Sequence, residues 1–335
     1  PGELRAVPLP PLFGSEAVQL RRQLAQPLSD SLRIELLCRL SDQLWAANTD
    51  SAAVYANRAL ALARRTGNRR GEGAALNRLG SALRESNLAR ALQLFQQSLR
   101  LGQALDDKRL QAQNLRSIGI IYVYLREQRR GLRYYFRALA LDRQRGDRSR
   151  EALGLSNIGL AYDLFGQPDS AAYYQHQAYA LARQLGAPTN YIYYGLGNGA
   201  RARGQTDSAR YYYRRSLRES EQRGHLRSLH FSYQGLALLY EQQGQPDSSI
   251  YYGRQGVQAA RQNGFLRGVL NGSVLLSGAF ERQGRPDSAL RYQQLLLAMK
   301  DTLFGQEKVM RLQDLSYQEQ QRTIRAAAAQ QALTS

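Results

Sequence analysis

Residue types that could catalyse a reaction or bind a metal are few in this 335-residue chain, and they are scattered. The three histidines, His176, His225 and His230, have no cysteines or carboxylates at metal-ligand spacing around them. The single cysteine, Cys38, can form no intrachain disulfide, and a free cysteine is most often a small buried hydrophobe. We therefore predict structural roles for all four residues, with no metal site and no cofactor.

The glycine-rich stretch Gly195, Gly197 and Gly199 is the segment closest to a nucleotide-binding loop. It follows no strand pattern and has no phosphate-binding lysine. Since glycine inside a helix costs about 1 kcal/mol relative to alanine, the string indicates close helix packing, with a hinge as the less favoured alternative. The chain also contains no nucleophile elbow and no HExxH motif. We predict that the chain as given is not an enzyme.

The formal net charge of +19 raises nucleic acid and anionic membranes as partners. The excess comes from arginine, because lysine occurs only at Lys108, Lys300 and Lys308. The arginines are spread along the sequence without a dominant cluster, and such a skew is more typical of genome base composition than of phosphate recognition. Nucleic acid is therefore disfavoured. No apolar run is long enough to span a bilayer, so a membrane is expected only through a span outside this chain.

An internal repeat shows which elements must position any binding residues. The string Gly-Gln-Pro-Asp-Ser occurs at 166–170 and 244–248, with close variants at 204–208 and 284–288. The successive glycines are 38, 40 and 40 residues apart, a period that predicts one two-helix unit per repeat. In each string we expect glycine to end one helix in a left-handed conformation, proline to stop that helix, and Asp or Ser to cap the next.

The helices on either side of each turn carry small and aromatic residues at helical spacing. Ala171 and Tyr174 follow one turn, and Ile158, Gly159 and Tyr162 precede it. Steps of about 40 residues in both directions recover weaker copies, which gives seven helix pairs. Small residues let neighbouring helices approach closely, and aromatic rings fill the gap between them, so we interpret the tyrosines as packing residues.

These patterns resemble the tetratricopeptide repeat (TPR) in its longer form of roughly 40 residues. The resemblance covers residues 29–300. It implies an all-α, right-handed superhelical solenoid of about seven helix-turn-helix repeats. Residues 1–28 are expected to form a proline-rich leader, similar to a clipped leader, and an N-terminal helix. Residues 301–335 are expected to form an amphipathic connector helix and an alanine- and glutamine-rich tail.

The segment that follows the repeats resembles the sequence that closes the extracytoplasmic TPR sensor region of bacterial two-component histidine kinases. The matching positions are Lys300, Asp301, Leu303, Phe304, Glu307, Lys308, Leu312, Asp314 and Leu315. In that family a membrane span and then a kinase or DNA-binding module follow, so a kinase would lie outside this chain. The resemblance implies a periplasmic or extracytoplasmic sensor domain in signal transduction, and we expect the C-terminal helix to offer a homodimer contact. The alternative is a free-standing cytoplasmic TPR adaptor that assembles protein complexes.

In proteins with this fold, the first helix of each pair lines a concave groove that holds a protein or peptide ligand. By that resemblance, the binding residues here would be Asn77, Arg78, Arg84, Arg116, Tyr124, Asn157, Asp163, Tyr191, Tyr194, Asn198, Arg201, Gln234 and Glu241. Asn157 is the first choice, because amide side chains can bind the unpaired N–H and C=O groups of an extended peptide. The lysine and asparagine clamp that some TPR domains use for C-terminal carboxylates is absent, which argues against a chaperone-tail receptor.

Overall fold

The computed structural model describes residues 15–301, 303 and 305, and every regular element among them is an α-helix. Its helices are α1 (Ser15–Leu24), α2 (Asp30–Trp45), α3 (Thr49–Arg65), α4 (Arg69–Leu83), α5 (Leu88–Ala104), α6 (Lys108–Tyr124), α7 (Gln128–Gln144), α8 (Arg148–Leu164), α9 (Pro168–Leu185), α10 (Asn190–Ala202), α11 (Thr206–Gln222), α12 (Leu226–Gln242), α13 (Pro246–Asn263) and α14 (Leu266–Arg282). A further helix covers 286–301. Among the described helices, none is both long and apolar enough for a membrane span.

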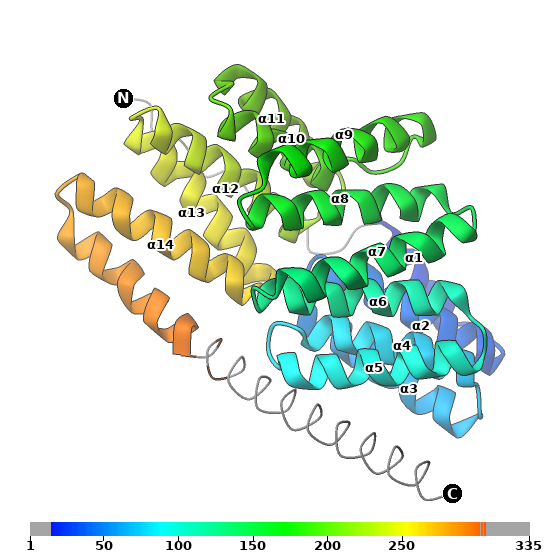
Figure 1. The fold of residues 1–335 in the computed structure, drawn as a ribbon. Coiled ribbons are helices and arrows are strands. Elements are labelled where there is room, and N and C mark those ends of the chain that lie inside the picture. The colour runs from blue at the N-terminus through cyan, green and yellow to red at the C-terminus, as the bar shows by residue number, and fades with distance from the viewer. Residues whose placement is uncertain (1–14, 302, 304, 306–335) are drawn as a thin grey trace, which may run out of the picture.

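After α1, the helices form seven antiparallel pairs that stack in chain order along a curved path (Figure 1). Each of α1 to α13 packs against the helix that follows it, and the first helices of several neighbouring pairs also touch, as α2 does α4. The predicted all-α solenoid of seven helix pairs is therefore confirmed. The predicted connector helix and tail lie outside the described residues apart from positions 301, 303 and 305.

Stacked aromatic rings hold the two helices of four pairs together at equivalent positions. In each case a ring from the first helix lies parallel, within 10°, to a ring twelve residues later on the second helix, with centroids 5.4–5.7 Å apart. The stacked rings are Tyr122 on Tyr134, Tyr162 on Tyr174, Tyr240 on Tyr252, and Phe280 on Tyr292. Such pairs add to the free energy gained by burying the rings, so the predicted packing role of these tyrosines is confirmed.

Glycines in the first helices allow the second helices to pack against the backbone. A Cβ atom added at Gly195 would lie 2.4 Å from the Gln175 side chain, and one added at Gly197 would lie 2.6 Å from the Tyr213 ring. Real Cβ atoms do not approach other atoms so closely, because van der Waals repulsion forbids it. The glycine-rich stretch of α10 is thus a site of close packing, as predicted, and its glycines serve that contact.

The turn strings end one helix as predicted but begin the next one differently. Gly166 and Gly244 adopt left-handed conformations, with φ of 70° and 66°, which end α8 and α12. The predicted Asp or Ser cap is wrong: the N-cap of α9 is Gln167, without a side-chain cap hydrogen bond, and Pro168 opens the helix. Proline has no N–H to leave unpaired there, and Asp169 in the first turn faces the positive end of the helix dipole.

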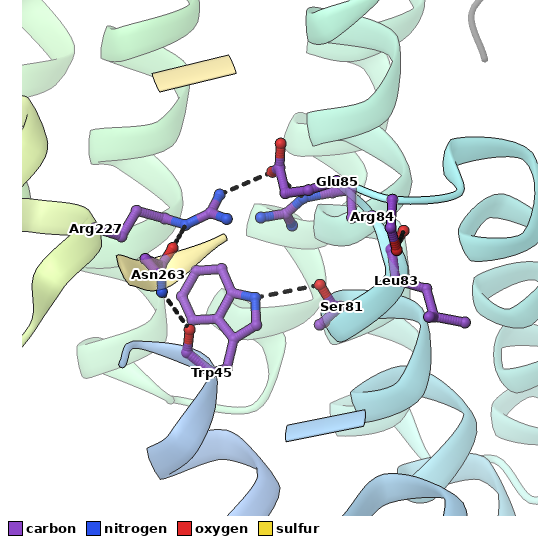
Figure 2. Close-up of polar contacts among 8 residues, drawn as sticks. Trp45, Ser81, Leu83, Arg84, Glu85, Arg227 and Asn263 are labelled. Carbon is purple, nitrogen blue, oxygen red and sulfur yellow. Dashed lines mark hydrogen bonds and ion pairs between the residues drawn. The ribbon is translucent and has the colours of Figure 1, made fainter. Parts of the chain in front are cut away.

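The first two repeats of the array contact the sixth. Asn263, which ends α13, donates a hydrogen bond from Nδ2 to the carbonyl oxygen of Trp45 at 2.9 Å and accepts one from Arg227 Nε at 3.1 Å (Figure 2). Arg227 also donates to Glu85 Oε1 at 3.0 Å, across 142 residues of sequence. We call Trp45, Glu85, Arg227 and Asn263 the seam. Both charged groups of the seam are at most 3% exposed. Since the seam joins repeats one and two to repeat six, these six repeats form a closed ring.

A buried histidine beside the seam makes stability depend on pH. His230 is fully buried, and its Nδ1 lies 3.0 Å from the Gly256 carbonyl oxygen. Burial, together with the nearby positive charge of Arg227, lowers its pKa from 6.5 to about 4. The unfolded chain therefore binds more protons between pH 6.5 and 4, so stability present above pH 6.5 is lost as the pH falls. Between pH 7 and 5 this histidine should cost about 2 kcal/mol of unfolding free energy.

Urea unfolding at both pH values measures this effect. His230→Asn retains a donor for the Gly256 carbonyl and should remove about 2 kcal/mol from the difference between pH 7 and pH 5. His176→Gln changes an exposed histidine and is the matched control. An unchanged pH difference in His230→Asn would contradict the assignment.

Candidate functional site

The inner side of the ring forms a half-open cavity of about 540 Å³, which lies within the range of roughly 300–1,000 Å³ typical of ligand sites. The first helix of every one of the seven pairs contributes to its wall, either directly or through a residue at its end. Residues from α2 and from α14 line the same space because the seam brings the ends of the array together. One ligand could therefore contact all seven repeats.

Ten of the thirteen residues predicted for the concave groove line this cavity. They are Asn77, Arg78, Arg84, Arg116, Tyr124, Asn157, Asp163, Tyr191, Tyr194 and Asn198. Arg201, Gln234 and Glu241 are outside its lining. Glu241 instead forms an ion pair with Arg282 of the next repeat. The last two repeats reach the cavity through the N-terminal halves of α12 and α14, so the predicted positions near the C-terminal half of α12 fall beyond it.

Asn157 differs from Asn77 and Asn198, which also line the cavity, in having an amide without a hydrogen bond among the described residues. Asn77 is buried, donates to Asn114 at 2.8 Å and accepts from Arg78 at 2.8 Å. Asn198 donates to Asp163 at 2.7 Å and accepts from the Tyr213 hydroxyl at 2.8 Å. Asn157 is half-buried, and no hydrogen bond of its amide is found among the described residues. Its amide is thus available to a ligand.

Asp163 is one of two carboxylates in the cavity wall, the other being Asp42. Burial raises the pKa of Asp163 above its ordinary value, and the hydrogen bond from Asn198 partly offsets that shift. The neighbouring tyrosine Tyr194 is also deeply placed, and burial raises its pKa as well. This end of the cavity therefore presents hydroxyl, amide and carboxylate groups in a weakly hydrated setting.

Arginine dominates the charge of the wall. Seven arginines line the cavity, from five different repeats: Arg78, Arg84, Arg116, Arg126, Arg150, Arg227 and Arg267. Two of them already have buried carboxylate partners behind the wall, Arg116 with Asp142 and Arg227 with Glu85. The linear sequence shows no arginine cluster, because these residues are up to 189 positions apart and only the curvature of the ring gathers them.

Aromatic rings cover the part of the wall next to the seam. They belong to Trp45, Tyr124, Tyr191, Phe231 and Phe265. The guanidinium of Arg227 lies 4.7 Å from the Trp45 ring centroid and 4.1 Å from that of Phe265, which places its charge over two ring faces. The resulting surface combines apolar area with positive charge.

Comparison with known proteins identifies the fold but not the function. The chain matches no protein-family model, and no curated protein matches it in sequence. A Rap protein complexed with Competence and Sporulation Factor superposes with a TM-score of 0.63 at 14% identity, over 87% of this chain and 86% of that one. The Rap conjugation gene regulator of plasmid pLS20, complexed with the Phr* peptide, also gives 0.63 at 14% identity, over 86% and 85%.

A third similar structure carries the repeat in its description. It is a signal transduction ATPase with a tetratricopeptide repeat sensor, from Pyrococcus horikoshii, with a TM-score of 0.50 at 14% identity over 88% of this chain and 50% of that one. The fold is that of a TPR-like solenoid. The seven pairs, the left-handed glycines and the stacked rings described above are its local basis.

The sequence prediction missed several residues of the cavity in this TPR-like solenoid. Trp45, Arg227, Phe231, Phe265 and Arg267 all line it. They lie at the C-terminal end of α2 and at or near the N-terminal ends of α12 and α14, away from the middle of the first helices where the TPR resemblance places binding residues. A weak signal existed, since Trp45 is the only tryptophan of the chain and carries no repeat equivalent.

Proposed function

We propose that the cavity binds an extended peptide or a peptide segment of a partner protein. The observation that supports this most is the free amide of Asn157 in the wall of a cavity lined by all seven repeats. An extended peptide presents unpaired N–H and C=O groups, which an amide can bind in pairs, while aromatic rings receive its side chains. Two Rap proteins of similar fold have been solved in complex with Competence and Sporulation Factor and the Phr* peptide, which is consistent with the proposal.

We further propose that the chain is the ligand-sensing region of a bacterial signal-transduction protein of the histidine kinase type. The supporting observation is the sequence resemblance from Lys300 to Leu315, which lies largely outside the described residues. A tetratricopeptide repeat sensor occurs in the signal transduction ATPase of similar fold. In the alternative, a free-standing adaptor, the same cavity would hold a segment of a partner protein.

The gene around this chain distinguishes the two roles. A signal peptide upstream, with a membrane span and a kinase downstream, is expected for the sensor. A reading frame that closes near Ser335 and encodes no signal peptide would exclude the sensor role and leave the adaptor. Peptide binding is tested separately, because both roles require it.

Removing the free amide should weaken peptide binding. Peptides are first selected from a randomised hexapeptide library on the immobilised chain and then titrated while Trp45 fluorescence is recorded. Asn157→Ala should raise the Kd about tenfold, because a buried peptide group then lacks its partner, at a cost of about 1–3 kcal/mol. Asn57→Ala, on the exposed side of α3, is the matched control and should have no effect. If both variants bind like the original chain, Asn157 has no role in binding.

A further inference from the structure

We propose that the peptide bound in this cavity is acidic and that two groups of arginines bind its carboxylates. This inference rests on the proposed peptide binding and adds the chemical class of the ligand. The first group consists of Arg78, Arg116 and Arg150, from α4, α6 and α8. The second group consists of Arg84, Arg227 and Arg267, which surround the aromatic rings at the seam.

Among the described residues, the cavity wall contains more arginines than carboxylates. Seven arginines and two aspartates line it, and Asp142 and Glu85 lie behind the wall as the partners of Arg116 and Arg227. Guanidinium groups in a partly apolar cavity attract carboxylates more strongly than they do in water, because the local dielectric constant is lower.

Arg84 is the clearest sign of a missing anion. It is 6% exposed, and its Nε is buried without a hydrogen-bond partner among the described residues. The nearest carboxylate oxygen, Glu85 Oε1, is 3.9 Å from this Nε and already accepts from Arg227. The Arg84 guanidinium lies 5.5 Å from the Trp45 ring centroid and 5.8 Å from that of Tyr124. A buried charge that lacks a close partner is costly, so a ligand carboxylate here would be strongly stabilised.

The arginines of the second group lie over the same two aromatic rings, Trp45 and Tyr124. Arg227 lies over the same Trp45 ring as Arg84, and the two side chains approach the indole from different repeats (Figure 2). Arg267 lies 4.6 Å from the centroid of the Tyr124 ring that Arg84 also contacts. Three guanidinium groups are thus held around two neighbouring rings, and Arg84 and Arg227 share the carboxylate of Glu85. A carboxylate that enters between them offsets their mutual repulsion.

The first group shows the same shortage of negative charge. The side chain of Arg150 forms no hydrogen bond or ion pair in the described part of the chain, and it lines the cavity together with Arg116 and Arg78. The charges of Asp42 and Asp147 also act on it, without a direct contact. Burial lowers the pKa of Arg150, and the positive charge of Arg116 lowers it further. Asp42, 3.3 Å from Arg78 Nε, is the one carboxylate in this part of the wall. A second carboxylate from a ligand would fit between these arginines electrostatically.

The size of the cavity fits a short peptide better than a nucleic acid. Proteins that bind single strands use a long basic groove that follows the phosphate backbone, with bases stacked along it. Here arginines from five repeats converge on one cavity of about 540 Å³. That arrangement suits two carboxylates on one extended peptide.

The preference for acidic peptides can be measured by titrating the 335-residue chain with three hexapeptide pools. Each pool is randomised at four positions and has Glu, Gln or Lys at the other two, and the change in Trp45 fluorescence reports binding, since Trp45 is the single tryptophan and lies in the wall. The Glu pool should bind at least tenfold more tightly than the Gln pool, and the Lys pool least tightly. Glu peptides with an amidated C-terminus show which carboxylates are bound. If they keep the preference over the Gln pool, the bound carboxylates belong to Glu side chains. If the preference is lost, the bound carboxylate is the C-terminus.

Matched variants connect the preference to the arginine groups. Arg84→Gln and Arg150→Gln should each weaken binding of the Glu pool about tenfold and leave the Gln pool unchanged. Glu85 keeps Arg227 as its closer partner after Arg84→Gln, and Arg150 forms no ion pair among the described residues, so the fold should persist, which circular dichroism checks. Arg137→Gln, exposed on α7 and outside the cavity wall, is the control.

The outcomes separate this inference from the proposed function. If no pool binds, peptide binding fails and the inference falls with it. If the Gln or Lys pool binds as tightly as the Glu pool, the cavity is a peptide site but not an acidic one. Displacement of the Glu pool by a single-stranded oligonucleotide at about 0.15 M salt would also overturn the inference, in favour of a phosphate ligand.

Discussion

Replacing Arg227 by alanine should lower the free energy of unfolding by about 3–5 kcal/mol and open the ring. Arg227 is 3% exposed and donates to both Glu85 and Asn263, so the substitution leaves a buried carboxylate and a buried amide oxygen unpaired. It also removes the cation from the Trp45 and Phe265 rings. Urea unfolding measures the stability loss, and small-angle scattering measures the expected increase in radius of gyration.

A neighbouring arginine provides the control for this experiment. Arg223 is about half exposed and pairs with Glu219 within one helix, so Arg223→Ala should change stability by less than about 1 kcal/mol. A second variant, Glu85→Gln, keeps an acceptor for Arg227 and should open the ring less than Arg227→Ala does. Equal stability and equal dimensions for Arg227→Ala and the original chain would show that the seam does not hold the ends together.

The second large effect is expected at Tyr213, the largest side chain that is fully buried. Its ring lies against two glycines of neighbouring first helices, where added Cβ atoms would come within 2.6 Å at Gly197 and 2.4 Å at Gly235. Tyr213→Ala should cost about 3–5 kcal/mol, towards the upper end, because glycines offer no side chains that could move in to fill the space. The midpoint of urea unfolding measures the loss.

Two comparisons separate the ring of Tyr213 from its hydroxyl. Tyr213→Phe keeps the ring but leaves Asn198 Oδ1 without its donor, so we expect a loss of about 1–2 kcal/mol. Tyr211→Ala removes a tyrosine that is 55% exposed on the same helix and should have a small effect. Similar losses for Tyr211→Ala and Tyr213→Ala would argue against a packing role specific to Tyr213.

The repeated local chemistry made most of the fold predictable. The left-handed glycines of the turn strings, Gly166, Gly204, Gly244 and Gly284, recur 38–40 residues apart, and one helix pair fits between successive strings. The residue types that pack helices also recur, as Gly159 and Tyr162 do. The helix caps were predicted wrongly, because a string such as Gly-Gln-Pro-Asp-Ser allows proline either to stop one helix or to open the next, and only the backbone of Pro168 decides.

Only those cavity residues that occupy repeated positions could be predicted from the sequence. Positions in the middle of first helices, such as Asn157 and Arg116, follow from the period and do line the wall. The seam does not follow from it, because Trp45 and Asn263 are 218 residues apart and neither has an equivalent in other repeats. For the same reason, the repeat did not predict that residues near the seam, such as Arg227, line the cavity. The binding role of all these residues stays a prediction.

The closed seam also determines how the molecule can deform. In an open solenoid, small rotations between neighbouring repeats add up and appear as free movement of the last repeat. Here Asn263 fastens the sixth repeat to Trp45 of the first, and Arg227 fastens it to Glu85 of the second, so a twist at one junction must be compensated at the others. The ring should therefore resist small deformations. It should widen abruptly, because widening begins only when the buried hydrogen bonds and the ion pair of the seam break.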